Sequence, residues 1–161
     1  MTFSIPYTSN KLSVDEIQDI INLYSQVNNP ILDTAIYYKN DHILSQLNLN
    51  NLEIDTKINP WFNNDFESGK LGMLSKSNIL KQLDTVKFNI NTLYLHSPDH
   101  ETPIFDTLQT CNNLYKQHRF KHLGLSNYSL TQIKEIIDVC EQYNFVKPSY
   151  YQGLYNPLCR K

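Results

Sequence analysis

The chain has 161 residues, of which 40% are hydrophobic and 19% are charged, and its formal net charge is −2. This length and balance predict one soluble globular domain and exclude a disordered chain. Lysine and arginine are scattered without a basic stripe, and no apolar run reaches the roughly 18 residues of a membrane span. Neither a nucleic acid nor a membrane is therefore an expected partner.

Cysteine usage and the N-terminal residues predict a cytoplasmic protein. Residues 1–6 lack a basic segment followed by an apolar stretch, so no signal peptide is expected. Cys111, Cys140 and Cys159 are widely spaced and form no C-x-x-C pattern, which favours reduced thiols over a disulfide or a metal site. The four glycines form no glycine-rich phosphate loop, so a nucleotide would have to be held in another way.

The first predicted element is a helix that begins after Ser13. Ser13 and Glu16 form a capping-box pattern, in which each side chain bonds the backbone amide of the other residue. Apolar residues then recur at helical spacing, namely Ile17, Ile20, Ile21, Tyr24 and Val27. Pro30 ends this pattern.

Four elements follow in the first half of the chain. They are a short buried strand, a brief helix, a second strand and a long loop, over residues 31–35, 41–47, 53–58 and 59–72. The loop contains Trp61, Phe62 and Phe66, which make it too apolar for a simple linker.

The second half repeats the alternation of helix and strand. A helix over 75–89 is predicted to bury Ile79, Leu80, Leu83 and Val86. A strand over 92–96 follows, and Thr102 then stands as a capping residue before Pro103 at the start of the next helix. That helix carries Leu108, Cys111, Leu114 and Tyr115.

The last predicted elements are a strand, a helix and a strand. The strands cover residues 122–127 and 149–153, and Ser129 caps the helix between them. The apolar face of this helix consists of Ile133, Ile136, Ile137 and Cys140. No low-complexity tract or linker divides residues 1–161, so we expect a single domain.

The alternation predicts a parallel sheet with right-handed crossovers. Periodicity alone does not distinguish an open sheet from a barrel, but barrels place functional side chains at the carboxyl ends of several strands. Candidate side chains fall at such ends in this chain. A complete barrel needs roughly 250 residues, and the chain shows five clear strands and a candidate sixth. The predicted fold is an incomplete (α/β)8 TIM barrel that lacks its last two βα units.

Four side chains at or beyond strand ends form a candidate proton-transfer site: Asp33, Tyr38, Lys57 and His96. A free phenol is a poor acid at neutral pH, and a nearby lysine ammonium lowers its pKa. A carboxylate keeps the lysine charged, and a histidine can bond the substrate oxygen. Taken singly, each residue has an ordinary structural explanation, such as a core tyrosine, a structural histidine, a turn aspartate or a solvated lysine.

Five segments resemble the aldo-keto reductase family, in family order. They are Ile31–Tyr38 with its Asp-Thr-Ala motif, Thr56–Trp61, Leu93–Pro103, Leu123–Tyr128 and Tyr151–Arg160. The second and third are similar to the branch that contains the aflatoxin-aldehyde and succinic-semialdehyde reductases. Together they cover residues from about 13 to 160.

The resemblance implies an (α/β)8 barrel that uses NADPH to reduce a small aldehyde or ketone. Tyr38 would be the acid, assisted by Lys57, Asp33 and His96. Ser126, Asn127 and Gln152 would hold the nicotinamide carboxamide, although read without the family the Ser-Asn pair is an ordinary strand-end turn. Trp61 would line the substrate pocket or pack on the barrel rim.

The chain departs from the family pattern at both ends. The first strand of the family carries a Gly-Thr motif, whereas residues 2–8 contain no glycine. Strands seven and eight, with the groups that hold the 2′-phosphate, are not found, which predicts unpaired edges and self-association, such as a homo-oligomer that completes the barrel. Three interpretations stay open: an active short reductase, an inactive truncated remnant and a non-enzymatic binding module.

Overall fold

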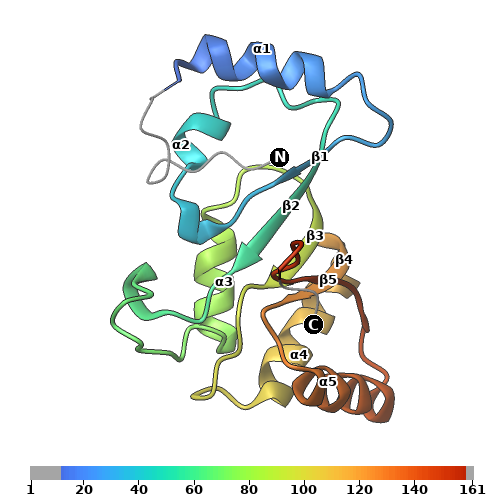
Figure 1. Ribbon diagram of the computed structural model, residues 1–161. Coiled ribbons are helices and arrows are strands. Elements are labelled where there is room, and N and C mark those ends of the chain that lie inside the picture. Colours follow the sequence, from blue (N-terminus) through green and yellow to red (C-terminus); the bar gives the residue numbers. More distant parts are fainter. Residues whose placement is uncertain (1–11, 159–161) are drawn as a thin grey trace.

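The structure is a computed structural model and describes residues 12–158. In chain order its elements are α1 (Val14–Tyr24), β1 (Ile31–Asp33), η2 (Ile36–Tyr38), α2 (Asp41–Leu44), β2 (Glu53–Ile58), η3 (Phe62–Asn64), α3 (Lys76–Asp84), β3 (Ile90–Leu95), α4 (Ile104–Lys116), β4 (Phe120–Ser126), α5 (Leu130–Tyr143) and β5 (Pro148–Gln152). Helices α1 and α5 lie at opposite ends of the molecule (Figure 1). The candidate strand at residues 2–8 lies outside the described residues.

The five strands form one parallel sheet in the order β1-β2-β3-β4-β5. The order in space is thus the order in the chain, and a helix lies between each pair of consecutive strands. A doubly wound open sheet reverses its strand order at a switch point and carries helices on both faces. Sequential order without reversal is the arrangement of a barrel wall. The predicted fold class is confirmed as part of a barrel.

One face of the sheet is apolar and packs against helices; we call it the helix-covered face. It consists of Ile58, Leu93, Leu95, Leu123 and Leu125, none of them more than 2% exposed. Their partners include Ile79 and Leu83 of α3, Leu108, Cys111 and Leu114 of α4, and Ile136 and Cys140 of α5. Because α3, α4 and α5 share this one cluster, they lie on the same side of the sheet.

The opposite side, which we call the polar face, has a different composition. Strand register places Lys57, Tyr94, Gly124 and Tyr150 in one row across β2 to β5. Side chains alternate between the faces of a strand, so this row faces away from Ile58 and Leu95. A Cβ atom at Gly124 would lie 2.4 Å from two carbons of the Tyr94 ring. Glycine at this position therefore makes room for the Tyr94 ring.

The predicted end of α3 and the predicted cap of α4 need correction. Helix α3 ends at Asp84 instead of residue 89, because Thr85 donates its hydroxyl to the carbonyl of Gln82 and tightens the last turn. Leu80 lies within α3 and is exposed, and Val86 packs on the core from beyond the helix. Thr102 does not cap α4, because its hydroxyl donates to Asp99.

Other predictions at helix ends and of burial have mixed outcomes. The capping box of Ser13 and Glu16 is present, and Ser129 forms a second one with Gln132. Helix α2 stops at Leu44 and not at residue 47, and Val27 and Tyr115 are exposed. Cys111 and Cys140 are free buried thiols, while Cys159 lies outside the described residues. No helix in residues 12–158 is long and apolar enough to cross a membrane.

Candidate active site

The predicted site residues lie at one edge of the sheet. Asp33, Ser126 and Gln152 end β1, β4 and β5, and Lys57 is the next-to-last residue of β2. His96 and Asn127 directly follow β3 and β4. Because all five strands are parallel, their carboxyl ends meet at this edge. Tyr38 reaches the same place from the short helix η2 that follows β1.

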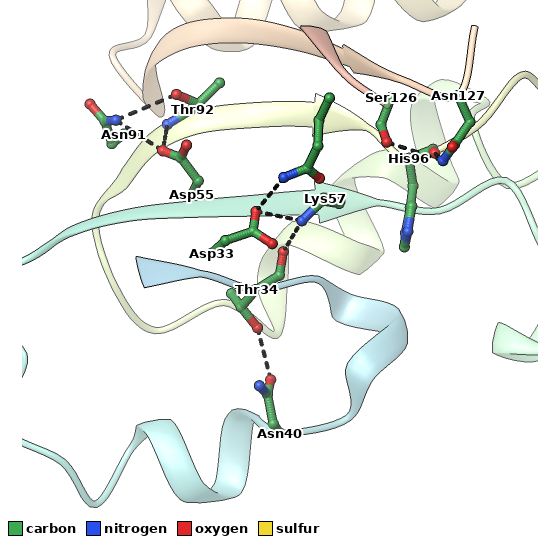
Figure 2. A network of polar contacts seen from close by, with 11 residues as sticks. Asp33, Thr34, Asn40, Asp55, Lys57, Asn91, Thr92, His96, Ser126 and Asn127 are labelled. Carbon is green, nitrogen blue, oxygen red and sulfur yellow. Dashed lines mark hydrogen bonds and ion pairs between the residues drawn. The ribbon is translucent and has the colours of Figure 1, made fainter. Parts of the chain in front are cut away.

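An ion pair between Lys57 and Asp33 forms the centre of the site. The Lys57 Nζ atom lies 2.5 Å from Asp33 Oδ1 and also donates to the Thr34 carbonyl at 2.9 Å (Figure 2). Lys57 is only 1% exposed. Burial lowers the pKa of Lys57, and the charge of Asp33 opposes this effect. The carboxylate thus helps to keep a buried amine protonated.

Tyr38 lies beside this ammonium. Lys57 Nζ is 5.4 Å from the centroid of the Tyr38 ring, within the range of a cation–π contact. The segment turns back at Lys39, whose φ of 53° is in the left-handed region. A hydrogen bond of 2.9 Å from Thr34 Oγ1 to Asn40 Oδ1 spans the turn. The Tyr38 ring is therefore held against the buried ammonium of Lys57.

His96 packs edge-on against Tyr38, with ring centroids 6.0 Å apart. Burial first, and then the positive charge of Lys57, lower the pKa of His96 to about 4. The imidazole is consequently neutral at pH 7. Its Nδ1 atom is buried and has no hydrogen-bond partner among residues 12–158. A neutral imidazole carries one N–H group, which can donate to an oxygen atom.

Aromatic side chains surround the imidazole. Trp61 is 8% exposed and its ring centroid lies 5.0 Å from that of His96. Tyr37 and Phe66 pack on Trp61 with centroid distances of 5.2 and 5.1 Å. We call Tyr37, Trp61 and Phe66 the aromatic wall. Tyr37 and Phe66 were not predicted as site residues. The position of Tyr37 next to Tyr38 in the sequence could have indicated that Tyr37 belongs to the site.

Ser126, Asn127 and Gln152 are brought together at the ends of β4 and β5. Asn127 adopts a left-handed φ of 62°, and its backbone amide donates to the Gln152 carbonyl at 3.2 Å. Its side-chain amide donates to the His96 carbonyl and to Ser126 Oγ, at 2.9 and 3.1 Å (Figure 2). Gln152 Nε2 donates to Asp33 Oδ1 at 3.3 Å. The three polar groups are thereby linked to His96 and Asp33.

A second buried carboxylate on the polar face was not predicted. Asp55 Oδ1 accepts hydrogen bonds from Asn91 Nδ2 and the Thr92 amide, at 2.9 and 3.0 Å (Figure 2). Burial and then the charge of Asp55 raise the pKa of Tyr94 to about 12. Asp55 lies two residues before Lys57, and strand periodicity was therefore enough to place both on one face.

Comparison with known proteins gives consistent results. The model of the Aldo/keto reductase family matches residues 1–161. Over 139 residues the chain is 35% identical to aflatoxin B1 aldehyde reductase member 2 of Rattus norvegicus, and 34% identical to aldo-keto reductase family 7 member A3 of Homo sapiens. These matches cover 81% of the chain but only 37% and 41% of the two relatives. The chain thus spans less than half of the length of these relatives.

Solved structures show the same fold. The thermostable aldo-keto reductase Tm1743 superposes with a TM-score of 0.69 at 18% identity, covering 89% of the chain and 51% of that protein. The aldose reductase of Schistosoma japonicum gives 0.62 at 19% identity, covering 84% and 50%. At these identities the likeness concerns the fold alone. It agrees with the incomplete barrel inferred from strand order.

Proposed function

Because the chain belongs to the aldo/keto reductase family, we propose that it carries the acid–base centre of an NADPH-dependent reductase of aldehydes or ketones. The observation that carries the proposal is the buried Lys57–Asp33 pair, with the ammonium 5.4 Å from the Tyr38 ring. A buried amine is costly unless it is paired, and here it lies over two phenol rings, Tyr38 at 5.4 Å and Tyr94 at 5.7 Å. The resemblance of the first two motifs to the family supports the same assignment.

Tyr38 is the general acid in this proposal. Its hydroxyl gives a proton to the carbonyl oxygen of the substrate, and solvent returns the proton afterwards. The Lys57 ammonium stabilises the negative charge left on the Tyr38 oxygen, and Asp33 keeps the amine protonated. His96, neutral because it is buried, bonds the same carbonyl oxygen and orients it.

The donor set at the strand ends fits the nicotinamide end of the cofactor. A carboxamide offers one acceptor oxygen and two N–H donors. A hydroxyl and two side-chain amides, from Ser126, Asn127 and Gln152, complement it from adjacent strands. When bound, the reduced nicotinamide would supply a hydride to the carbonyl carbon. Trp61 then lines the space for the rest of the substrate.

The open edge of the sheet bears on whether this centre works in the isolated chain. Among the described strands, β5 pairs only with β4. Tyr151, Leu154 and Tyr155 near this edge are 56%, 74% and 77% exposed. An unpaired strand edge beside apolar side chains favours association. A second copy of the chain that completes the barrel is the proposed partner, and light scattering after size exclusion tests it.

The first test is a fluorescence titration with NADPH, with NADH as control. Selective NADPH binding supports the reductase proposal, whereas absence of binding favours the alternatives of an inactive remnant or a binding module. The second test is Tyr38→Phe, followed by NADPH oxidation with small aldehydes. We expect the rate to fall roughly 10²- to 10⁴-fold, the usual contribution of a general acid, while NADPH binding persists.

Tyr37→Phe is the matched control, because Tyr37 precedes Tyr38 and packs on Trp61. It removes a hydroxyl of the same kind from the adjacent position. We expect it to keep most of the rate. Equal rates in native protein and Tyr38→Phe would remove Tyr38 from the mechanism.

A further inference from the structure

One carboxylate connects the loop that carries Trp61 to the loop that carries His96. Asp99 Oδ1 accepts a hydrogen bond from the Gly72 amide, and Asp99 Oδ2 accepts one from the Leu74 amide, both at 2.9 Å. We call residues 59–75 the Trp61 loop. Gly72 and Leu74 belong to its second arm, which runs back towards α3. Asp99 lies three residues after His96, in the connection between β3 and α4.

The same carboxylate also organises its own loop. Oδ1 accepts from the Glu101 amide at 3.1 Å, and Oδ2 accepts from Thr102 Oγ1 at 2.8 Å. Four donors thus converge on two oxygens. Hydrogen bonds to an ionised acceptor are about twice as strong as neutral ones. An asparagine has only one acceptor oxygen, and its amide would face N–H groups. The arrangement therefore requires a carboxylate.

Holding the returning arm also holds Trp61. Within the Trp61 loop the two arms are joined by Phe62 N to Lys70 O at 2.8 Å and by Met73 N to Pro60 O at 3.2 Å. These bonds lie on either side of Trp61 in sequence. A displacement of residues 72–74 would consequently be passed to the indole. The indole packs directly against the His96 ring, 5.0 Å between centroids.

A second attachment holds the base of the Trp61 loop and does not involve Asp99. The buried Gln82 side chain bonds the backbone of Asn59 at both N–H and C=O, and it donates to the Met73 carbonyl. Gln82 lies on α3 and holds the base of the loop. Asp99, in contrast, connects the loop to the segment that carries His96.

We propose that Asp99 is a positioning residue that fixes Trp61 against His96 and so sets the wall met by the substrate. The proposal rests on the function proposed above, in which His96 bonds the carbonyl oxygen and Trp61 contacts the rest of the substrate. Asp99 does not touch the reacting atoms. Its effect is on how closely the aromatic wall is held over the bound molecule.

The single tryptophan of the chain makes the proposal measurable without turnover. In Asp99→Asn we expect a red-shifted Trp61 emission and about tenfold more frequent exposure of the indole to acrylamide, the effect of losing one charge-assisted hydrogen bond. Asp65→Asn is the matched control. Asp65 lies in the same loop and accepts two backbone amides at 3.1 and 3.2 Å, from Glu67 and Ser68, but does not reach the His96 segment. An Asp99→Asn protein that is folded and matches the Asp65→Asn protein in both readouts overturns the proposal.

Hydrogen exchange in the unmodified chain keeps the test decisive if Asp99→Asn does not fold. The amides of Gly72 and Leu74 are expected to be protected and to exchange together, because one carboxylate holds both. Exchange at the rate of free peptide at either amide would overturn the proposal.

Kinetics then separate this inference from the proposed function. Asp99→Asn should raise KM several-fold for bulky aldehydes and leave kcat nearly unchanged, since a wall contact acts alike on substrate and transition state. Asp99→Glu keeps the negative charge, so its KM should lie between that of the native protein and that of Asp99→Asn. A fluorescence change in a chain without reductase activity supports the positioning of Trp61 and removes only the reductase proposal. A fall in kcat with KM unchanged contradicts the role given to Asp99.

Discussion

Near the centre of the sheet, residues on both faces are buried, but the two faces differ in the chemistry of their side chains. On the helix-covered face, Leu93 and Leu123 are fully buried among other aliphatic side chains. On the polar face, Lys57 is 1% exposed and is held by Asp33 and a backbone carbonyl. Consecutive residues of one strand therefore serve opposite purposes, since Lys57 and Ile58 are neighbours in β2.

The two faces differ in how much they contribute to the stability of the fold. Each Å² of apolar surface removed from water contributes about 25 cal/mol, and the helix-covered face collects this gain from three helices. A buried ion pair gains little over a well-packed apolar pair, because desolvation offsets the attraction. Lys57 and Asp33 are thus poor choices for a core, which supports the proton-transfer role proposed for them.

The largest expected effect comes from replacing the ion pair as a unit. In Asp33→Asn/Lys57→Met we expect carbonyl reduction to fall roughly 10²- to 10⁴-fold, because the charge that stabilises the ionised acid is gone. The free energy of unfolding should change little, because removing both charges together leaves no unpaired ion in the protein interior. Activity assays and urea unfolding of the same preparations measure both quantities.

An exposed ion pair provides the control for that double substitution. Lys121 and Glu53 are 2.8 Å apart, with side chains 64% and 45% exposed. Glu53→Gln/Lys121→Met should change neither activity nor stability appreciably, since exposed pairs contribute little. If the Asp33→Asn/Lys57→Met protein unfolds much more easily than this control, the polar face has a structural role as well.

On the helix-covered face we expect the reverse result. Leu93→Ala should cost about 3 kcal/mol of unfolding free energy, because Leu93 is fully buried and the cavity cannot close completely. The rate per folded molecule should persist. Leu130→Ala, at a position 69% exposed, is the control and should cost less than about 0.5 kcal/mol. Chemical denaturation followed by circular dichroism gives both values, and similar losses at the two positions would contradict the assigned core.

The pH dependence of stability tests the polar face at His96. The folded-state pKa is about 4, below the ordinary value near 6.5. Between these values the unfolded chain binds a proton that the folded chain does not bind. The contribution of His96 is therefore fully present above pH 6.5 and decreases as the pH falls towards 4. From pH 7 to pH 5 the loss should be about 2 kcal/mol.

The comparison of native protein with His96→Gln isolates this contribution. Carboxylates that also titrate in acid are the same in both proteins, so their effects cancel in the difference. Urea unfolding at pH 7 and pH 5 should show the smaller decrease for His96→Gln. Equal decreases would mean that His96 is protonated as easily in the folded chain as in the unfolded one.

Much of the fold follows from periodicity in the sequence. The five strands were predicted to within about two residues, because buried β-strands bounded by turn residues give a strong pattern. Asp33, Lys57 and His96 could be assigned to one edge, because the carboxyl ends of parallel strands coincide. The approach of Lys57 to Asp33 was implied by the same rule and by the chemistry of the two groups.

What the sequence did not reveal depends on loop conformation and on contacts between distant residues. Trp61 and Phe66 of the aromatic wall flank Asn63 and Asn64, whose φ angles of 52° and 57° are left-handed, and no spacing rule predicts this loop conformation. The bonds from Gly72 and Leu74 to Asp99 join residues more than 20 positions apart. The early end of α3 depends on a side-chain bond of Thr85, which competes locally with the helix.

The smallest expected effect concerns two serines, Ser75 and Ser129, at the N-cap positions of the helices α3 and α5. Ser129 caps α5 by accepting the Gln132 amide, whereas Ser75 at the start of α3 makes no side-chain capping bond. Ser129→Ala should therefore cost about 1 kcal/mol, and Ser75→Ala distinctly less. Thermal unfolding of both variants at one pH measures the difference.

Since neither serine lies on the polar face, both variants should reduce substrate at the native rate. A loss of rate in Ser129→Ala would mean that the capping of α5 also controls Ser126 and Asn127, and the division between the two faces would then fail at the end of β4.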